Sequence, residues 1–137
     1  MTIELTKMTT PKGRPAVHMR SSGYMTGDDA AKVNTSLQPG APFADLPIFA
    51  VVTEDAEFSV EARKGFASMG GANPENSDLP TAVVLRSTPQ RMMISFIMKA
   101  SDQLRGRKTP MKFFSNEAEA LGWLDAELDR LPARPAR

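Results

Sequence analysis

The side chains that could do chemistry are few in this sequence, and they complete no catalytic set. Cysteine is absent and His18 is the single histidine, which excludes disulfides, thiolate zinc sites and cysteine nucleophiles. No second histidine or cysteine is there to join His18 in a metal site or catalytic couple. No serine lies in a Gly-x-Ser-x-Gly elbow, and the glycines form no dinucleotide or Walker fingerprint. We therefore expect a protein that is not an enzyme and uses no cofactor.

Four residues near position 88 could bind an anion. Arg86, Ser87, Thr88 and Arg91 surround the expected start of a helix, where free backbone amides and the helix dipole attract negative charge. The run Ser87-Thr88-Pro89-Gln90 also forms a capping box with proline in the first turn, and this box needs no ligand. The four residues are therefore a candidate anion site with an alternative, purely structural explanation.

The other charged clusters can be explained as solvated loops. Glu54, Asp55 and Glu57 follow an expected central strand, where acidic side chains could hold a divalent cation. A solvated loop explains them as well, so we predict no metal site. Lys and Arg number 17 against 16 Asp and Glu, and the basic cluster at 105–108 lacks interleaved aromatic residues. Nucleic acid is therefore not an expected partner.

The elements that must position these residues follow from hydrophobic periodicity and turn signals. Apolar and polar residues alternate over 3–6 and again over 17–20, after the turn Pro11-Lys12-Gly13. This pattern predicts an antiparallel hairpin with His18 on its polar face. Thr26 can cap a helix that ends near Leu37, because Pro39-Gly40 follows.

Two short apolar segments predict the centre of the sheet. Ile48–Val52 and Thr81–Leu85 have almost no polar residues, as is typical of parallel strands covered on both faces. A helix signal follows each of them, at Ser59 and at Ser87. A short strand from Met111 to Phe114 then precedes a last helix, which Asn116 can cap.

The element order is therefore β-β-α-β-α-β-α-β-α. It predicts a single α/β domain over residues 1–131, with an N-terminal β-hairpin followed by alternating helices and strands around a five-stranded mixed sheet. Residues 132–137 should form a flexible basic tail. No apolar run is long enough to span a bilayer, and no signal peptide is evident at the N-terminus, so we expect a cytoplasmic protein.

The expected helix from Thr88 to Ser101 has an unusually wide apolar surface. Its apolar residues cover an arc of about 240°, whereas docking on one face of a sheet needs little more than about 100°. The excess could meet a second copy or a protein partner, flanking segments of this chain, or a lipid-like ligand. If Met92 and Phe96 face the sheet, the expected homodimer or partner interface is formed by Met93, Ile94, Ile97 and Met98.

Three segments resemble the SpoIIAA-like bacterial proteins, a branch of the STAS (anti-sigma-factor antagonist) superfamily. They are Gly23-Tyr24-Met25-Thr26 with Asp29, the helix start Glu61-Ala62-Arg63, and the aromatic strand end with its Ala-Leu-x-Trp-Leu helix over 114–124. The similarity spans roughly residues 2 to 128. It implies a STAS-like fold for the domain.

The resemblance also implies two classes of function. Phosphorylated anti-sigma antagonists carry an Asp-Ser-Ser-Gly motif, but the matching segment here, Thr53 to Ser59, lacks the paired serines and the glycine. Ser59 is therefore a candidate modified residue whose simpler role is that of a helix N-cap. We expect a non-enzymatic regulatory or protein-interaction module. The alternative is a binding protein for a small apolar or lipid-like molecule, as kinship of this branch to CRAL-TRIO domains suggests.

Overall fold

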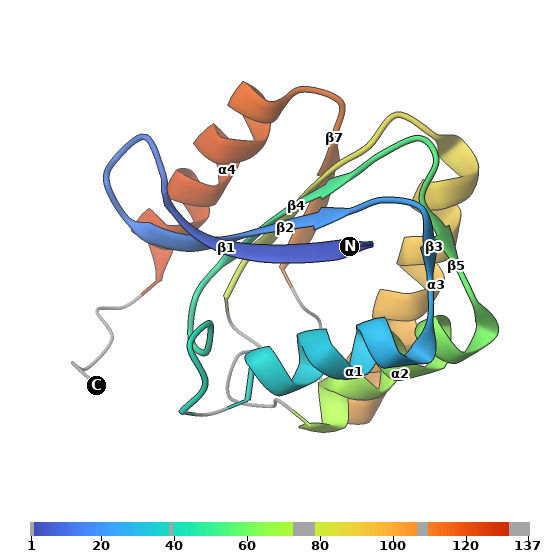
Figure 1. The fold of residues 1–137 in the computed structure, drawn as a ribbon. Helices are drawn as coiled ribbons and strands as arrows, with labels where there is room; N and C mark the ends of the chain where they lie inside the picture. The colour runs from blue at the N-terminus through green and yellow to red at the C-terminus, as the bar shows by residue number, and fades with distance from the viewer. Residues whose placement is uncertain (1, 39, 73–78, 107–109, 132–137) are drawn as a thin grey trace.

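A five-stranded mixed sheet forms the centre of the molecule (Figure 1). The structure is a computed structural model that describes residues 2–38, 40–72, 79–106 and 110–131. The strand order is β1-β2-β4-β6-β7, and β1 and β2 form an antiparallel hairpin, whereas β2, β4, β6 and β7 run parallel. The strands are β1 (Ile3–Thr9), β2 (Pro15–Ser21), β4 (Ile48–Val52), β6 (Thr81–Val84) and β7 (Met111–Phe114). The predicted α/β fold is confirmed, and the predicted tail at 132–137 lies outside the described residues.

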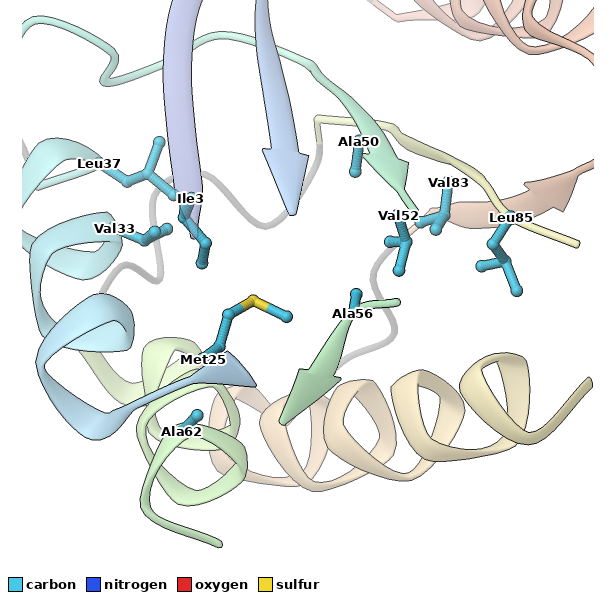
Figure 2. Close-up of a cluster of buried hydrophobic side chains, with 10 residues drawn as sticks. All are labelled: Ile3, Met25, Val33, Leu37, Ala50, Val52, Ala56, Ala62, Val83 and Leu85. Atoms are coloured by element: carbon cyan, nitrogen blue, oxygen red, sulfur yellow. The ribbon is translucent and has the colours of Figure 1, made fainter. Parts of the chain in front are cut away.

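Helices cover both faces of the sheet. On one face lie α1 (Gly27–Ser36), α2 (Val60–Ala72) and α3 (Thr88–Arg105), and on the other lies α4 (Glu117–Arg130) (Figure 1). The sheet therefore has two cores. The larger one faces α1–α3 and contains the side chains shown in Figure 2, and the smaller one packs Phe49 and Phe114 against Leu124 of α4.

The helix starts follow the capping residues in the sequence. Thr26 accepts a hydrogen bond from the Asp29 amide, and the Asp29 carboxylate accepts one from the Thr26 amide, so α1 begins with a complete capping box. Asn116 accepts from the Glu119 amide and caps α4. The predicted caps of these two helices are confirmed.

The helix expected to end at Ser101 is longer in the structure. Helix α3 continues through Arg105, and Gly106 ends it with φ of 77°. Glycine adopts this left-handed conformation without the steric penalty of a Cβ atom, so it is a frequent helix terminator. The basic residues at 107 and 108 lie outside the described residues.

Two very short strands connect the sheet to the helix layer. β3 (Tyr24–Met25) and β5 (Glu57–Phe58) form a separate parallel ladder that leads into the starts of α1 and α2 (Figure 1). The Glu57 amide donates to the Gly23 carbonyl at 2.8 Å, and the Ser59 amide donates to the Met25 carbonyl at 3.0 Å. The sequence did not predict this ladder, because two residues are too few to show an alternation.

The helices α1 and α2 pack closely because glycine lies at their contact. A Cβ atom added at Gly65 would lie 2.7 Å from the Cβ atom of Ala30, closer than such atoms approach in proteins. The three helices α1–α3 contact one another extensively, with α2 in the middle, whereas their backbones make few close contacts with the strands. Helices α1 and α3 each pack on α2, so the three form one layer whose side chains pack on the sheet.

A polar cluster joins the β1–β2 turn to α4. Asp125 is 3% exposed, and its carboxylate accepts hydrogen bonds from the Thr10 hydroxyl at 2.6 Å and from the Lys12 amide at 3.1 Å. The Arg14 guanidinium donates to the Asp125 carbonyl at 2.8 Å, and it also pairs with Asp129. These contacts fix the hairpin tip on the last helix.

Candidate functional site: an apolar cavity

A cavity of about 170 Å³ lies between the sheet and the helices α1–α3. The space is partly open to solvent. Its described lining residues come from the strands β2, β4, β5, β6 and β7, from three helices and from the segments that join them. The lining residues are Met19, Ser21, Val33, Leu37, Leu46, Ile48, Ala50, Val52, Phe58, Phe66, Leu79, Pro80, Thr81, Val83, Ile94, Ile97, Met98, Ser101 and Met111.

The sheet side of the cavity follows from strand alternation. Every second residue of a strand points to the same face, so Ile48, Ala50 and Val52 of β4 lie beside Thr81 and Val83 of β6 on the cavity face. Figure 2 shows Ala50, Val52 and Val83 directed from the sheet toward the helices. The uniformly apolar sequence of these strands is explained by burial of both faces.

The helix side of the cavity is dominated by α3. Ile94, Ile97, Met98 and Ser101 line it at the i, i+3, i+4 and i+7 spacing of one helix face. Val33 of α1, the C-cap residue Leu37 and Phe66 of α2 complete this side. The cavity is therefore built mainly from the helix whose apolar surface was too wide for simple docking.

The predicted orientation of α3 was wrong. Phe96 is 71% exposed and Met92 is 58% exposed, so neither packs on the sheet. Of the expected interface residues, Ile97 is buried, Ile94 and Met98 line the cavity, and Met93 is half-buried. Periodicity gives the relative angles of residues around a helix but not the direction in which the helix faces, and this explains the error.

The β3–β5 ladder contributes one wall of the cavity. Phe58 of β5 lines the space and packs edge-on against Phe66 of α2, with ring centroids 6.0 Å apart. Met25 of β3 is fully buried and points from the ladder into the region between sheet and helices (Figure 2). These side chains support the separation between the two layers.

Three hydroxyl groups are the polar side chains among the described lining residues. They belong to Ser21, Thr81 and Ser101, and none of the described lining residues carries a charge. Within the described part of the chain, none of these hydroxyls has a hydrogen-bond partner. The cavity is therefore an apolar space with a few isolated hydrogen-bonding groups, as is typical of small-molecule sites.

Two residues of the candidate anion site at the start of α3 make structural contacts within the protein. Ser87 accepts a hydrogen bond from the Gln90 amide and is the N-cap. The Arg91 guanidinium lies 5.4 Å from the centre of the Phe113 ring, in a cation–π contact. Arg86 and Thr88 are exposed. All four residues surround the helix start as predicted, but the structure assigns no ligand to them.

Only one of the two hydrogen bonds of the expected capping box at Ser87 is formed, because the Gln90 side chain bonds to another segment instead of to the Ser87 amide. Its Nε2 donates to the carbonyls of Thr53 and Ala56, each at 2.9 Å. Gln90 is buried, and its Oε1 has no hydrogen-bond partner in the described structure. Gln90 thus ties the segment between β4 and β5 to α3. The sequence showed Gln90 as a capping residue but not this longer connection.

The acidic segment after β4 is exposed at Glu54, Asp55 and Glu57. The Thr53 hydroxyl donates to the Asp55 carboxylate, and this bond lowers the pKa of Asp55. Among the described residues, no three carboxylate or imidazole side chains are arranged as ligands of one metal ion. The solvated-loop explanation accounts for these side chains.

Two further residues have structural roles away from the cavity. Ser59 is 7% exposed and its hydroxyl accepts a hydrogen bond from the Ala62 amide at 3.0 Å, so it caps α2. His18 is half-buried and packs on Phe49, with ring centroids 5.6 Å apart. It therefore lies on the α4 face of the sheet, where it contacts the smaller core instead of a purely polar surface.

Comparison of the chain with protein-family models, with curated proteins and with solved structures finds no match. In the part of the chain that the structure describes, no helix combines the length and the apolar character needed to cross a membrane. Any functional conclusion therefore rests on the site geometry described above.

Proposed function

We propose that this protein is a non-enzymatic binding protein for a small apolar molecule, which it holds between the sheet and the helices α1–α3. The observation that carries the proposal is the cavity of about 170 Å³ with its almost wholly apolar lining. Engineered cavities of roughly 150 Å³ lined by Leu, Ile and Phe bind benzene. The cavity therefore has room for a molecule of about one ring.

The free energy of apolar burial supports this proposal. An apolar molecule between the layers loses its contact with water, which contributes about 25 cal/mol per Å² of apolar surface buried. Because such a molecule binds the folded state, it stabilises that state by an amount that increases with its concentration.

A cavity-filling variant tests the proposal. Native mass spectrometry of freshly purified protein reports a co-purifying ligand and the subunit number.

A thermal melting experiment uses p-xylene as a defined apolar probe. We expect p-xylene to raise the melting temperature of the wild type. Ala50→Leu places a larger side chain in the cavity, so it should raise the melting temperature of the free protein and remove the p-xylene effect. Ala118→Leu, on the exposed side of α4, is the matched control. A wild type that neither carries nor binds an apolar molecule contradicts the proposal.

A second candidate function, a protein-interaction module, is favoured by the outer side of α3. Met92 and Phe96 are large apolar residues one turn apart on this side, and both are more than half exposed. A second copy of the chain is the occupant we propose, because two-fold dimers are the commonest oligomers and use the same patch twice. Sedimentation equilibrium should show a dimer that Phe96→Lys converts to a folded monomer. A wild-type monomer at micromolar concentration contradicts this interface.

The resemblance to SpoIIAA-like STAS proteins supports both candidates, since it implies regulation or apolar-ligand binding. We propose on the same basis that the protein works in the cytoplasm as a STAS-like domain. The Ser59 environment argues against regulation through phosphorylation, because the hydroxyl is buried and already used as an N-cap. Ligand binding and partner binding are compatible, because they use opposite sides of α3.

A further inference from the structure

We infer that the cavity selects an uncharged, ring-sized molecule that carries a hydroxyl or carbonyl group, and that it rejects carboxylates. This inference rests on the proposed function. It is carried by the three hydroxyls of Ser21, Thr81 and Ser101, which line the cavity without a hydrogen-bond partner in the described structure, and by the absence of charge from the described lining residues.

The two serines are the decisive groups. Ser21 and Ser101 are each only 4% exposed, and both line the cavity. Within the described structure neither hydroxyl is engaged in a hydrogen bond, so both are available to a molecule in the cavity. A ligand oxygen that pairs with one of these hydroxyls would satisfy both groups at once.

The hydroxyls lie at two ends of the cavity. Ser21 is the last residue of β2 and pairs with Val52, whereas Thr81 is the first residue of β6 and pairs with Ile48. Along the strands these positions are four residues apart, or about 13 Å. Ser101 is near the end of α3, which runs back along the sheet after β6, so it lies toward the Thr81 end. A ring-sized ligand therefore finds a hydroxyl at whichever end its polar group occupies.

The charge of the lining determines which ligands are excluded. Among the described residues no Lys, Arg or His lines the cavity, so a carboxylate would lose its hydration and gain no cationic partner from them. A neutral hydroxyl or carbonyl needs only one or two hydrogen bonds, which the serines and Thr81 can provide. The site thus distinguishes alcohols, phenols and ketones from acids of the same size.

Two pairs of probes of matched size test the inference. p-Cresol and p-xylene differ in one hydroxyl against one methyl group, and acetophenone and benzoate differ mainly in charge. Dissociation constants are measured by NMR titration for the wild type and for Ser21→Ala/Thr81→Val/Ser101→Ala. We expect the triple variant to bind p-cresol about tenfold more weakly and p-xylene at least as tightly as the wild type. The wild type should bind acetophenone and not benzoate.

The single variants Ser21→Ala and Ser101→Ala identify the polar end and replace the triple variant if it fails to fold. Ser95→Ala, on the exposed side of α3, is the matched control and should change neither dissociation constant. The selectivity is contradicted if the triple variant weakens p-cresol and p-xylene binding equally, or if the wild type binds benzoate as tightly as acetophenone. In either case, binding of p-xylene to the wild type would still support the proposed function. If no probe binds, the proposed function itself fails.

Discussion

Phe96 and Ile97 are neighbours in α3, about 100° apart around its axis, and they meet different surroundings. Phe96 is exposed to solvent, whereas Ile97 lines the cavity. One helix therefore presents apolar residues both to the interior and to the surface. This division accounts for the wide apolar arc in the sequence, since one part of the arc forms the cavity wall and the other contains the exposed side chains of Met92 and Phe96.

Lysine substitutions distinguish the two sides of α3. Ile97→Lys places an unpaired charge in the cavity wall and should lower the free energy of unfolding by more than about 3 kcal/mol. Phe96→Lys should change it by less than about 0.5 kcal/mol in the monomer, because the side chain is already exposed. Urea denaturation measures both values. If Phe96→Lys unfolds the protein, the orientation of α3 is incorrect.

The buried carboxylate of Asp125 should be essential for the attachment of the hairpin. Asp125→Ala leaves the Thr10 hydroxyl and the Lys12 amide without their acceptor, so we expect a loss of about 3 kcal/mol in unfolding free energy. Arg130→Ala removes the exposed pair with Glu127 on the same helix and should cost less than about 0.5 kcal/mol. Similar losses for the two variants would show that the cluster contributes no more than a surface ion pair.

Acid should weaken the start of α1 through Asp29. The Thr26 amide donates to the Asp29 carboxylate at 2.9 Å and lowers the pKa of Asp29. Because this pKa is lower in the folded state, the carboxylate contributes stability above the unfolded pKa of about 3.9, and the contribution is lost as the pH falls through the folded value. Asp29→Asn should therefore be less stable than the wild type at pH 6 and lose less stability between pH 6 and pH 3. Urea unfolding at the two pH values tests this, and an identical pH dependence would contradict it.

Ser59 should behave as a structural cap. Ser59→Ala removes the acceptor of the Ala62 amide and should lower the free energy of unfolding by about 1 kcal/mol. The folded protein should gain no phosphate when it is incubated with bacterial lysate and ATP, and intact-mass analysis checks this. Stoichiometric phosphate on Ser59 would instead support a role as a phosphorylated anti-sigma antagonist.

The elements of the fold could be predicted from the sequence because their signals are local. Apolar runs gave the central strands β4 and β6, and Thr26 and Asn116 marked the starts of two helices. The sequence also indicated that α3 has more apolar surface than a sheet needs. Its true end at Arg105 was missed because a glycine was interpreted as part of a loop instead of as a helix terminator.

The cavity could not be predicted because it depends on the spacing of two layers. The β3–β5 ladder that separates them is too short to leave a sequence pattern, and the contact of Gly65 with Ala30 joins residues 35 positions apart. The hydroxyls of Ser21 and Ser101 lie even further apart in the chain. They become parts of one site only when α3 is placed over the sheet with Ile97 facing inward.

Methionine methyl groups provide the most direct test of ligand binding in the cavity. Met19, Met98 and Met111 line it, whereas Met92 is exposed on α3 and Met8 packs in the smaller core on the α4 face. In a titration of methyl-labelled protein with p-xylene, the resonances of Met19, Met98 and Met111 should shift with one common dissociation constant, while those of Met8 and Met92 stay unchanged. Unchanged resonances at the three lining methionines, or shifts confined to Met92, would contradict binding between the sheet and the helices.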